Sequence, residues 1–117
     1  NLIKNSHDAI VERRIPSGKI TISVEEHGTS ICILVCDNAG GVSDKIAAKI
    51  FEPYFSTKSD NGTGLGLYMS KSIVEEHCHG SLTHHNTDEG ACFTILIPIH
   101  DENTTSDASQ SPNVSPV

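Results

Sequence analysis

The strongest structural signal in the sequence is the stretch Asp60-Asn-Gly-Thr-Gly-Leu-Gly-Leu-Tyr-Met-Ser-Lys-Ser-Ile-Val-Glu-Glu-His77, in which a glycine-rich loop passes directly into a helix. Glycine occupies alternate positions at Gly62, Gly64 and Gly66, and helically spaced apolar residues then follow without another Gly or Pro until Gly80. A loop of this kind presents unpaired N–H groups and the positive end of a helix dipole to an anion, above all a phosphate. The alternative is an ordinary glycine-rich turn, because the spacing matches neither the P-loop nor the dinucleotide-binding fingerprint.

An aromatic loop leads into this stretch from its N-terminal side. Phe51-Glu-Pro-Tyr-Phe-Ser-Thr-Lys58 contains a proline, and its single cation, Lys58, can reach a phosphate held by the glycines. Before it, Ser43 is expected to be the N-cap of a short helix over residues 44–50. A merely solvated Lys58 is the alternative, and the aromatic residues would also serve as hydrophobic plugs.

The remaining segments predict one α+β domain. Residues 1–14 carry a helical apolar pattern, residues 19–26 alternate as in a half-buried strand, and residues 31–36 are almost wholly apolar, as in a strand buried on both faces. Residues 81–85 and 91–99 read as a hairpin closed by the turn at residues 86–90.

Polar residues at the ends of these elements suggest a nucleotide site. Asn1 and Asn5 share one face of the first helix, and an amide oxygen such as that of Asn5 suits Mg²⁺. Asp37 ends the apolar strand, where its carboxylate can accept a hydrogen bond from an exocyclic amine, a contact worth about 1.5–3 kcal/mol that favours adenine over guanine. Gly40 and Gly41 allow the backbone to approach a base closely. Solvated helix amides and a simple Asp-Asn turn are the alternatives.

Composition and charge argue against nucleic-acid-binding and membrane-spanning proteins. A net charge of -7 argues against nucleic acid as a partner, and no apolar run approaches the roughly 20 residues that span a bilayer, so this segment is expected to make no direct membrane contact. The four cysteines have no CxxC spacing and are expected to be reduced and mostly buried. The histidines around His77 and His84 match no structural zinc pattern.

Taken together, these segments resemble the conserved boxes of sensor histidine kinases, in the order of that family. The matching stretches are Asn1-Leu-Ile-Lys-Asn5 (N box), Asp37-Asn-Ala-Gly-Gly41 (G1), Ile50-Phe-Glu-Pro-Tyr-Phe-Ser-Thr-Lys58 (F), Gly62-Thr-Gly-Leu-Gly-Leu67 (G2) and Gly90-Ala-Cys-Phe-Thr94, the closing glycine box. The resemblance implies the C-terminal catalytic domain, with the Bergerat ATP-binding fold: a two-layer α/β sandwich whose mixed sheet is covered by helices on one face. It also implies ATP and Mg²⁺ as ligands.

The resemblance also implies roles for individual residues. Asn5 matches the magnesium ligand and Asn1 a phosphate-side or metal-shell amide, while Asp37 matches the residue that reads the adenine amino group. Asn5 and Lys58 are the residues expected to act in catalysis. The rest of the implied nucleotide site comprises Ala39 (often glycine in the family) and Gly41 at the base, the lid aromatics Phe51 and Phe55, and Gly62, Thr63, Gly64, Leu65, Gly66 and Leu67 around the phosphates.

The implied activity is that of a protein-histidine kinase in a two-component phosphorelay. None of the seven histidines has the setting of a phosphoacceptor, so this chain is expected to bind ATP without phosphorylating itself. The alternative is an ATP-hydrolysing relative of the mismatch-repair, gyrase or heat-shock type. Those enzymes carry a glutamate where Asn1 stands, and an amide cannot take a proton from water. A degenerate module used only for docking is a third possibility, expected to have lost Asp37 or the glycines.

The expected organisation is an ATP-binding domain over residues 1–99, lacking its N-terminal part, and a disordered polar tail over residues 100–117. The implied partners are the histidine-bearing dimerisation domain of the parent kinase and a response regulator. A cytoplasmic location follows from the same resemblance, and any membrane anchor of the parent is expected outside this segment. Part of the apolar sheet face is expected to be exposed.

Overall fold

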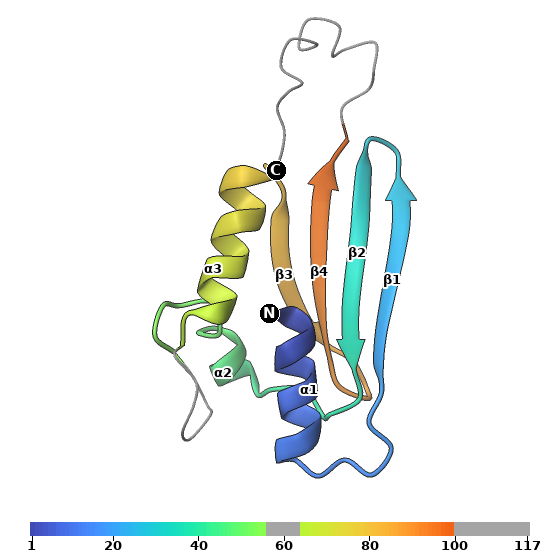
Figure 1. Cartoon of the computed structure of the whole chain (residues 1–117), viewed down its shortest axis with the longest axis vertical. Coiled ribbons are helices and arrows are strands. Elements are labelled where there is room, and N and C mark those ends of the chain that lie inside the picture. The colour runs from blue at the N-terminus through green and yellow to red at the C-terminus, as the bar shows by residue number, and fades with distance from the viewer. Residues whose placement is uncertain (56–63, 100–117) are drawn as a thin grey trace, which may run out of the picture.

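A four-stranded sheet with helices on one face makes up the structure (Figure 1). The computed structural model describes residues 1–55 and 64–99. The strands are β1 (Ile20–His27), β2 (Ser30–Asp37), β3 (Ser81–Asn86) and β4 (Ala91–Pro98), and their order in the sheet is β1-β2-β4-β3. The two-layer α+β prediction is confirmed. The expected mixture of strand directions is not found among these four strands, because β1–β2 and β3–β4 are hairpins and β4 joins β2 antiparallel as well.

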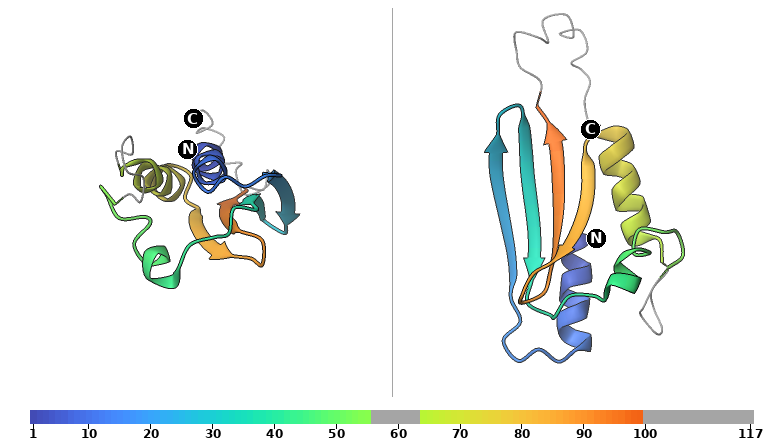
Figure 2. Two further views of the ribbon diagram at one scale, coloured as in Figure 1. Left: turned by 90° about the horizontal axis from the view of Figure 1, so that it is seen from below. Right: turned by 180° about the vertical axis from the view of Figure 1, so that it is seen from behind.

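The helical layer consists of α1 (Leu2–Glu12) and α3 (Gly66–Ser72), which lie on the same face of the sheet (Figure 2). Helix α3 continues into η1 (Ile73–His77), a π-helical segment that the apolar spacing did not predict. The short α2 (Asp44–Ala47) ends earlier than predicted, but its N-cap is confirmed, since the Oγ of Ser43 accepts a hydrogen bond from the Ile46 N–H at 3.3 Å. No helix within residues 1–55 and 64–99 is long and apolar enough to cross a membrane.

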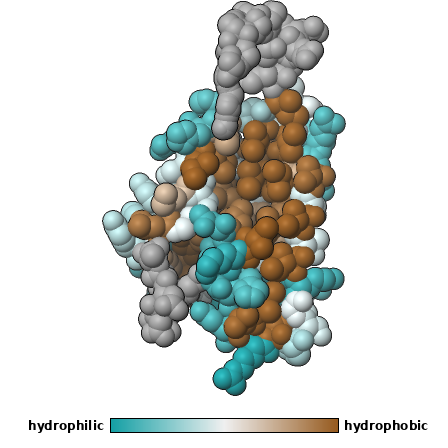
Figure 3. All heavy atoms as spheres, viewed as in Figure 1, coloured by the Kyte–Doolittle hydropathy of each residue, from teal (hydrophilic) through white to brown (hydrophobic). Residues whose placement is uncertain are grey.

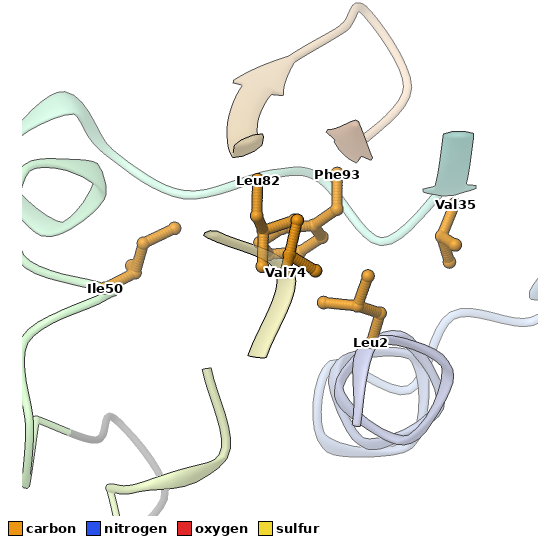
Figure 4. Close-up of a cluster of buried hydrophobic side chains, with 6 residues drawn as sticks. All are labelled: Leu2, Val35, Ile50, Val74, Leu82 and Phe93. Carbon is orange, nitrogen blue, oxygen red and sulfur yellow. The ribbon is translucent and has the colours of Figure 1, made fainter. Parts of the chain in front are cut away.

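Side chains of the hydrophobic core pack the helical layer against the sheet. Leu82 of β3 is fully buried, and it belongs to a cluster (Figure 4) formed by Leu2, Val35, Ile50, Val74, Leu82 and Phe93. Leu2 contributes from α1 and Val74 from η1, so packing in this cluster sets where each helix lies over the sheet. The cluster therefore also determines the position of the polar residues that α1 carries.

The edge strand β1 is less buried than predicted. Strand β1 forms as predicted, but Ile22 and Val24 are exposed by 52% and 66%. They pair with Val35 and Ile33 and hence point to the helix-bearing face, which is uncovered there. Figure 3 shows hydrophobic surface on this face beside α1. Strand β2 was predicted to be buried on both faces, but several of its residues are only half-buried. The prediction that part of the apolar sheet face is exposed is confirmed by Ile22 and Val24.

The expectation that all four cysteines are reduced is wrong. Cys36 and Cys92 form a disulfide, while Cys32 and Cys78 are free. The two bonded residues face each other directly across β2 and β4, with their Cα atoms 4.0 Å apart. The two cysteines are 56 residues apart in the sequence, and this spacing does not predict that they pair. The pairing depends on the register between β2 and β4.

Candidate functional site

A cavity of about 350 Å³ lies between α1, one end of the sheet and the beginning of α3. Its size is in the range of small-molecule sites, which combine apolar walls with a few placed polar groups. The apolar lining includes Ile46, Ile50, Phe55, Leu67, Ala91 and Phe93, and the polar lining includes Asn1, Lys4, Asn5, Ser6, Asp8, Glu12, Arg13, Asp37 and His84. Residues far apart in the sequence therefore converge on one space.

Asp37 is held rigidly at the end of β2. It is 8% exposed, and its Oδ1 accepts hydrogen bonds from the backbone N–H groups of Ala39 at 3.0 Å and Ala91 at 3.3 Å. Within residues 1–55 and 64–99, both hydrogen bonds to this carboxylate end on Oδ1. A ligand with an N–H group can therefore meet an oriented, buried carboxylate oxygen without breaking the contacts that hold it.

The loop after Asp37 approaches the cavity with its backbone. Gly41 has φ of +73°, and a Cβ there would come within 2.5 Å of the Oδ1 of Asn86, so the site requires glycine. Ala39 lines the cavity and is not among the residues with positive φ, which explains why alanine fits where the family often has glycine. Arg13, which the sequence analysis missed, donates to the carbonyl oxygens of Ala39 at 2.7 Å and of Gly41, and so positions this loop from α1.

The two amides of the first helix have different surroundings. The Nδ2 of Asn1 donates to the Gly66 carbonyl at 3.2 Å and to the Ser70 Oγ at 3.0 Å, and this links α1 to α3. Asn5 lines the cavity one turn later, and Asp8 follows on the same side, with its carboxylate 3.0 Å from the Lys4 Nζ. Amide and carboxylate oxygens are the donors that Mg²⁺ accepts, so this wall suits a hydrated magnesium ion.

Gly64 brings the glycine-rich and aromatic segments together. The Tyr54 N–H donates to the Gly64 carbonyl at 2.7 Å, and a Cβ at Gly64 would overlap the Tyr54 backbone. Gly64 also has φ of +77°, which favours glycine. Gly64, Gly66 and Leu67 line the cavity.

The remaining predicted residues differ in whether they line the cavity. Phe55 lines the cavity, but Phe51 packs against the core, edge-on to Phe93 with ring centroids 6.2 Å apart. Leu65 precedes α3 as its N-cap residue and does not line the cavity. Lys58, Gly62 and Thr63 lie outside the described residues, as does the proposed tail at residues 100–117.

Two polar residues of the cavity that have buried side-chain atoms were missed by the sequence analysis. The Oγ of Ser6 on α1 and the Nε2 of His84 on β3 are buried and have no hydrogen-bond partner in the described part of the chain. The His84 ring lies 5.2 Å from the Phe93 ring, tilted by 54°. Strand periodicity was the available signal, since His84 follows the core residue Leu82 by two positions and so shares its face.

The environment of His84 gives the domain a predicted acid sensitivity. Burial, and to a lesser extent the neighbouring His85, lower the pKa of His84 from its ordinary value of 6.5, and Asp37 opposes the shift. The folded state then binds fewer protons than the unfolded state, so the free energy of unfolding falls as the pH drops below 6.5 through the lowered pKa. We expect urea denaturation at several pH values to show this loss for the wild type and a smaller one for His84→Leu. An unchanged pH dependence in the variant would contradict the assignment.

Comparison with known proteins identifies the family. The family model described as histidine kinase-, DNA gyrase B- and HSP90-like ATPase matches residues 1–101. The chain belongs to this ATPase family. Among curated relatives, this ATPase domain is 40% identical over 103 residues to the C4-dicarboxylate transport sensor protein DctS of Rhodobacter capsulatus, covering 87% of the chain and 15% of the relative. It is 40% identical over 99 residues to sporulation kinase B of Bacillus subtilis, covering 84% and 22%. It thus spans less than a quarter of either relative.

Solved structures agree with this assignment. The catalytic domain of histidine kinase ThkA superposes with a TM-score of 0.64 at 31% identity, covering 83% of this ATPase domain and 67% of that chain. ThkA in complex with the response regulator protein TrrA superposes with a TM-score of 0.57 at 27% identity, covering 84% and 28%. The predicted Bergerat fold and the resemblance to sensor histidine kinases are confirmed, and this is a histidine kinase-type ATPase domain.

Proposed function

We propose that the cavity binds ATP with Mg²⁺ and that the domain donates the γ-phosphate to a histidine of a separate dimerisation domain in the parent protein. The observation that carries this proposal is the convergence of Asn5, Asp37 and Gly66 on one cavity. Asn5 on α1 offers an oxygen ligand for a cation, and Asp37 at the end of β2 offers an acceptor for the amino group of a base. Gly66 at the start of α3 allows the backbone to approach a phosphate closely. Membership of the ATPase family supports the choice of nucleotide.

Each wall of the cavity has a part in this proposal. The buried carboxylate of Asp37 accepts a hydrogen bond from the adenine amino group, while Gly41 and Ala39 lie beside the base. Gly64 and Gly66 lie beside the phosphates, and Asn5 would hold Mg²⁺. When bound, the cation would neutralise phosphate charge, which a chain of net charge -7 otherwise offsets poorly. Lys58 is proposed to contact the phosphates from the aromatic loop.

The reaction proposed is phosphoryl transfer between two domains. A ring nitrogen of the acceptor histidine forms a bond to the γ-phosphorus as the bond to the bridging oxygen breaks, giving phosphohistidine and ADP. The contribution of this domain is to orient the triphosphate. Asn1 favours transfer over hydrolysis, because its amide donates to Gly66 and Ser70 and cannot act as a base toward water. A response regulator is the proposed next partner, as ThkA forms such a complex, and the cytoplasm is the proposed location.

Calorimetric titration with the non-hydrolysable analogues AMPPNP and GMPPNP, with Mg²⁺ or with EDTA, tests the proposal. We expect AMPPNP to bind at least about tenfold more tightly than GMPPNP, because one charge-assisted hydrogen bond is lost with guanine. Asn5→Ala should remove the gain that Mg²⁺ gives while keeping the preference for adenine. Val11→Ala, a truncation to alanine on the exposed side of α1 and outside this cavity, is the control and should change neither.

Two results would overturn the proposal. A folded chain that does not bind AMPPNP would show that the cavity is not a nucleotide site. Equal affinity for both analogues would remove the role given to Asp37. Transfer of ³²P from ATP to a separately prepared histidine-bearing domain then tests the reaction itself, and release of inorganic phosphate without transfer would favour the hydrolase alternative.

A further inference from the structure

We propose that His84 is a second base-contacting residue, whose Nε2 hydrogen-bonds the edge of the nucleotide base away from Asp37, directly or through one water molecule. This inference rests on the proposed function and names a specificity-determining residue within the same site. It comes from three observations: the position of His84 in the sheet, an unmet hydrogen-bonding need, and the charge around the ring.

The strand register places His84 and Asp37 on opposite sides of a small floor. His84 of β3 pairs with Phe93 of β4, and Phe93 in turn pairs with Val35 of β2, so these side chains share the helix-bearing face. Asp37 lies two residues beyond Val35, beside Ala91, to whose N–H it is bonded. Strand β4 therefore separates the two polar residues, which lie about 10 Å apart across two strand spacings and about 7 Å apart along the strands, or about 12 Å on the diagonal. A planar base lying over Ala91 and Phe93 meets a polar group on each side.

Two polar side chains of β3 on this side of the sheet differ in their hydrogen bonding. Asn86, two residues further along β3, has partners at both ends of its amide, which accepts from the Val42 N–H at 3.0 Å and donates to the Val42 carbonyl at 2.6 Å. The Nε2 of His84 is buried and has no partner within residues 1–55 and 64–99. A buried polar atom without a partner costs about 1–3 kcal/mol, so such atoms usually mark a missing water or ligand.

The opposite wall of the same cavity shows a matching feature. Ser6 of α1 is 1% exposed, and its Oγ is the other buried side-chain atom without a partner in that part of the chain. Ser6 and His84 both line the cavity, one from the helix and one from the sheet. Two unmet polar atoms facing one space indicate an occupant that is itself polar, which agrees with a nitrogenous base and disagrees with an apolar ligand.

The charge around His84 suits a neutral imidazole contact. Burial lowers its pKa, so the ring is neutral at pH 7 and can accept or donate at Nε2. Besides His84, the charged or titratable groups that line the cavity in the described part of the chain are Asp37 on β2, Lys4, Asp8 and Glu12 on α1, and Arg13 at the end of α1, while His85 follows His84 on β3. The Asp37 carboxylate requires a hydrogen-bond donor on one edge of the base. The His84 Nε2 requires a hydrogen-bonding group on the opposite edge, so the two residues together select among bases more strictly than Asp37 does by itself.

Three variants of the 117-residue chain test the inference by calorimetric titration with Mg²⁺·AMPPNP. His84→Leu keeps the approximate bulk without a hydrogen-bonding group, and we expect it to weaken binding about three- to tenfold, the effect of one neutral hydrogen bond. His84→Gln places an amide nitrogen or oxygen near the position of Nε2 and should restore affinity to within about twofold of the wild type. His85→Leu changes the neighbouring histidine, which points to the opposite face, and should bind like the wild type.

A wild-type measurement accompanies these variants. In ¹⁵N-detected NMR spectra of the histidine rings, the Nε2 resonance of His84 should shift on saturation with Mg²⁺·AMPPNP while that of His85 stays in place. This measurement decides the question even where His84→Leu does not fold.

Several results would overturn the inference. They are equal affinity of His84→Leu and the wild type, equal losses in the Leu and Gln variants, or an unmoved His84 resonance. If the wild type binds AMPPNP and Asp37→Asn weakens it, these results reject only the role of His84. If the wild type does not bind at all, the proposed function fails as well.

Discussion

Asp37→Asn is expected to weaken AMPPNP binding by about ten- to hundredfold while the domain stays folded. The side chain is buried, and its Oδ1 already accepts from Ala39 and Ala91, so the substitution can preserve both backbone contacts. The substitution then replaces the other carboxylate oxygen, Oδ2, by an NH₂ group. A donor then faces the adenine amino donor, and a charge-assisted hydrogen bond of about 1.5–3 kcal/mol is lost. The measurement is a calorimetric titration, with thermal melting to show that the fold persists.

Asp88→Asn is the matched control for this substitution, because Asp88 is exposed in the turn between β3 and β4 and does not line the cavity. Its affinity for AMPPNP should equal that of the wild type. Unchanged affinity in Asp37→Asn, with the control also unchanged, would mean that this carboxylate serves only to hold the loop and the end of β4.

Gly90→Ala is expected to lower the free energy of unfolding by about 2–3 kcal/mol and to impair the site at the same time. A Cβ on Gly90 would overlap the carbonyl oxygen of Asp37 and lie 2.6 Å from its Oδ1. The obstacle is backbone, so β2 and β4 must separate where Asp37 is positioned. Urea denaturation measures the stability loss, and AMPPNP titration of the folded fraction measures the loss of affinity.

Gly28→Ala provides the comparison, because Gly28 lies in the β1–β2 turn with φ of +62° and nothing within 4 Å of an added Cβ. Only the backbone conformation opposes the change there, which costs about 1 kcal/mol. We expect Gly28→Ala to bind AMPPNP normally. Equal stability losses in the two variants would show that β4 tolerates a side chain at Gly90 and that the close approach to Asp37 is dispensable.

Local signals predicted much of the fold. Helical spacing of apolar residues predicted α1 and α3, alternation predicted β1, and the turn before Ala91 predicted the β3–β4 hairpin. The N-cap role of Ser43 also followed from its position before a helix. These features depend on neighbours within a few residues, so the linear order contains the information.

Some residues of the candidate cavity were selected from the sequence for a different reason. Asn5, Asp37, Gly41 and Gly66 were chosen as residues with distinctive chemistry or through family resemblance, and the fold does bring them to one cavity. Arg13 and His84 were missed, because an arginine at a helix end and a histidine in a strand are usually solvent-facing. Their roles depend on which backbone atoms and rings lie opposite, and residue type alone does not contain that information.

The amino-acid order was thus sufficient for most elements of secondary structure and for the family. The tertiary structure decided which strands are neighbours, and with that the Cys36–Cys92 disulfide, the exposure of Ile22 and Val24, and the burial of His84. The physical reason is that local conformation responds to near neighbours in the chain. Register and coverage of a sheet instead arise from contacts between residues many positions apart, and a shift of one residue would turn each of these side chains to the other face.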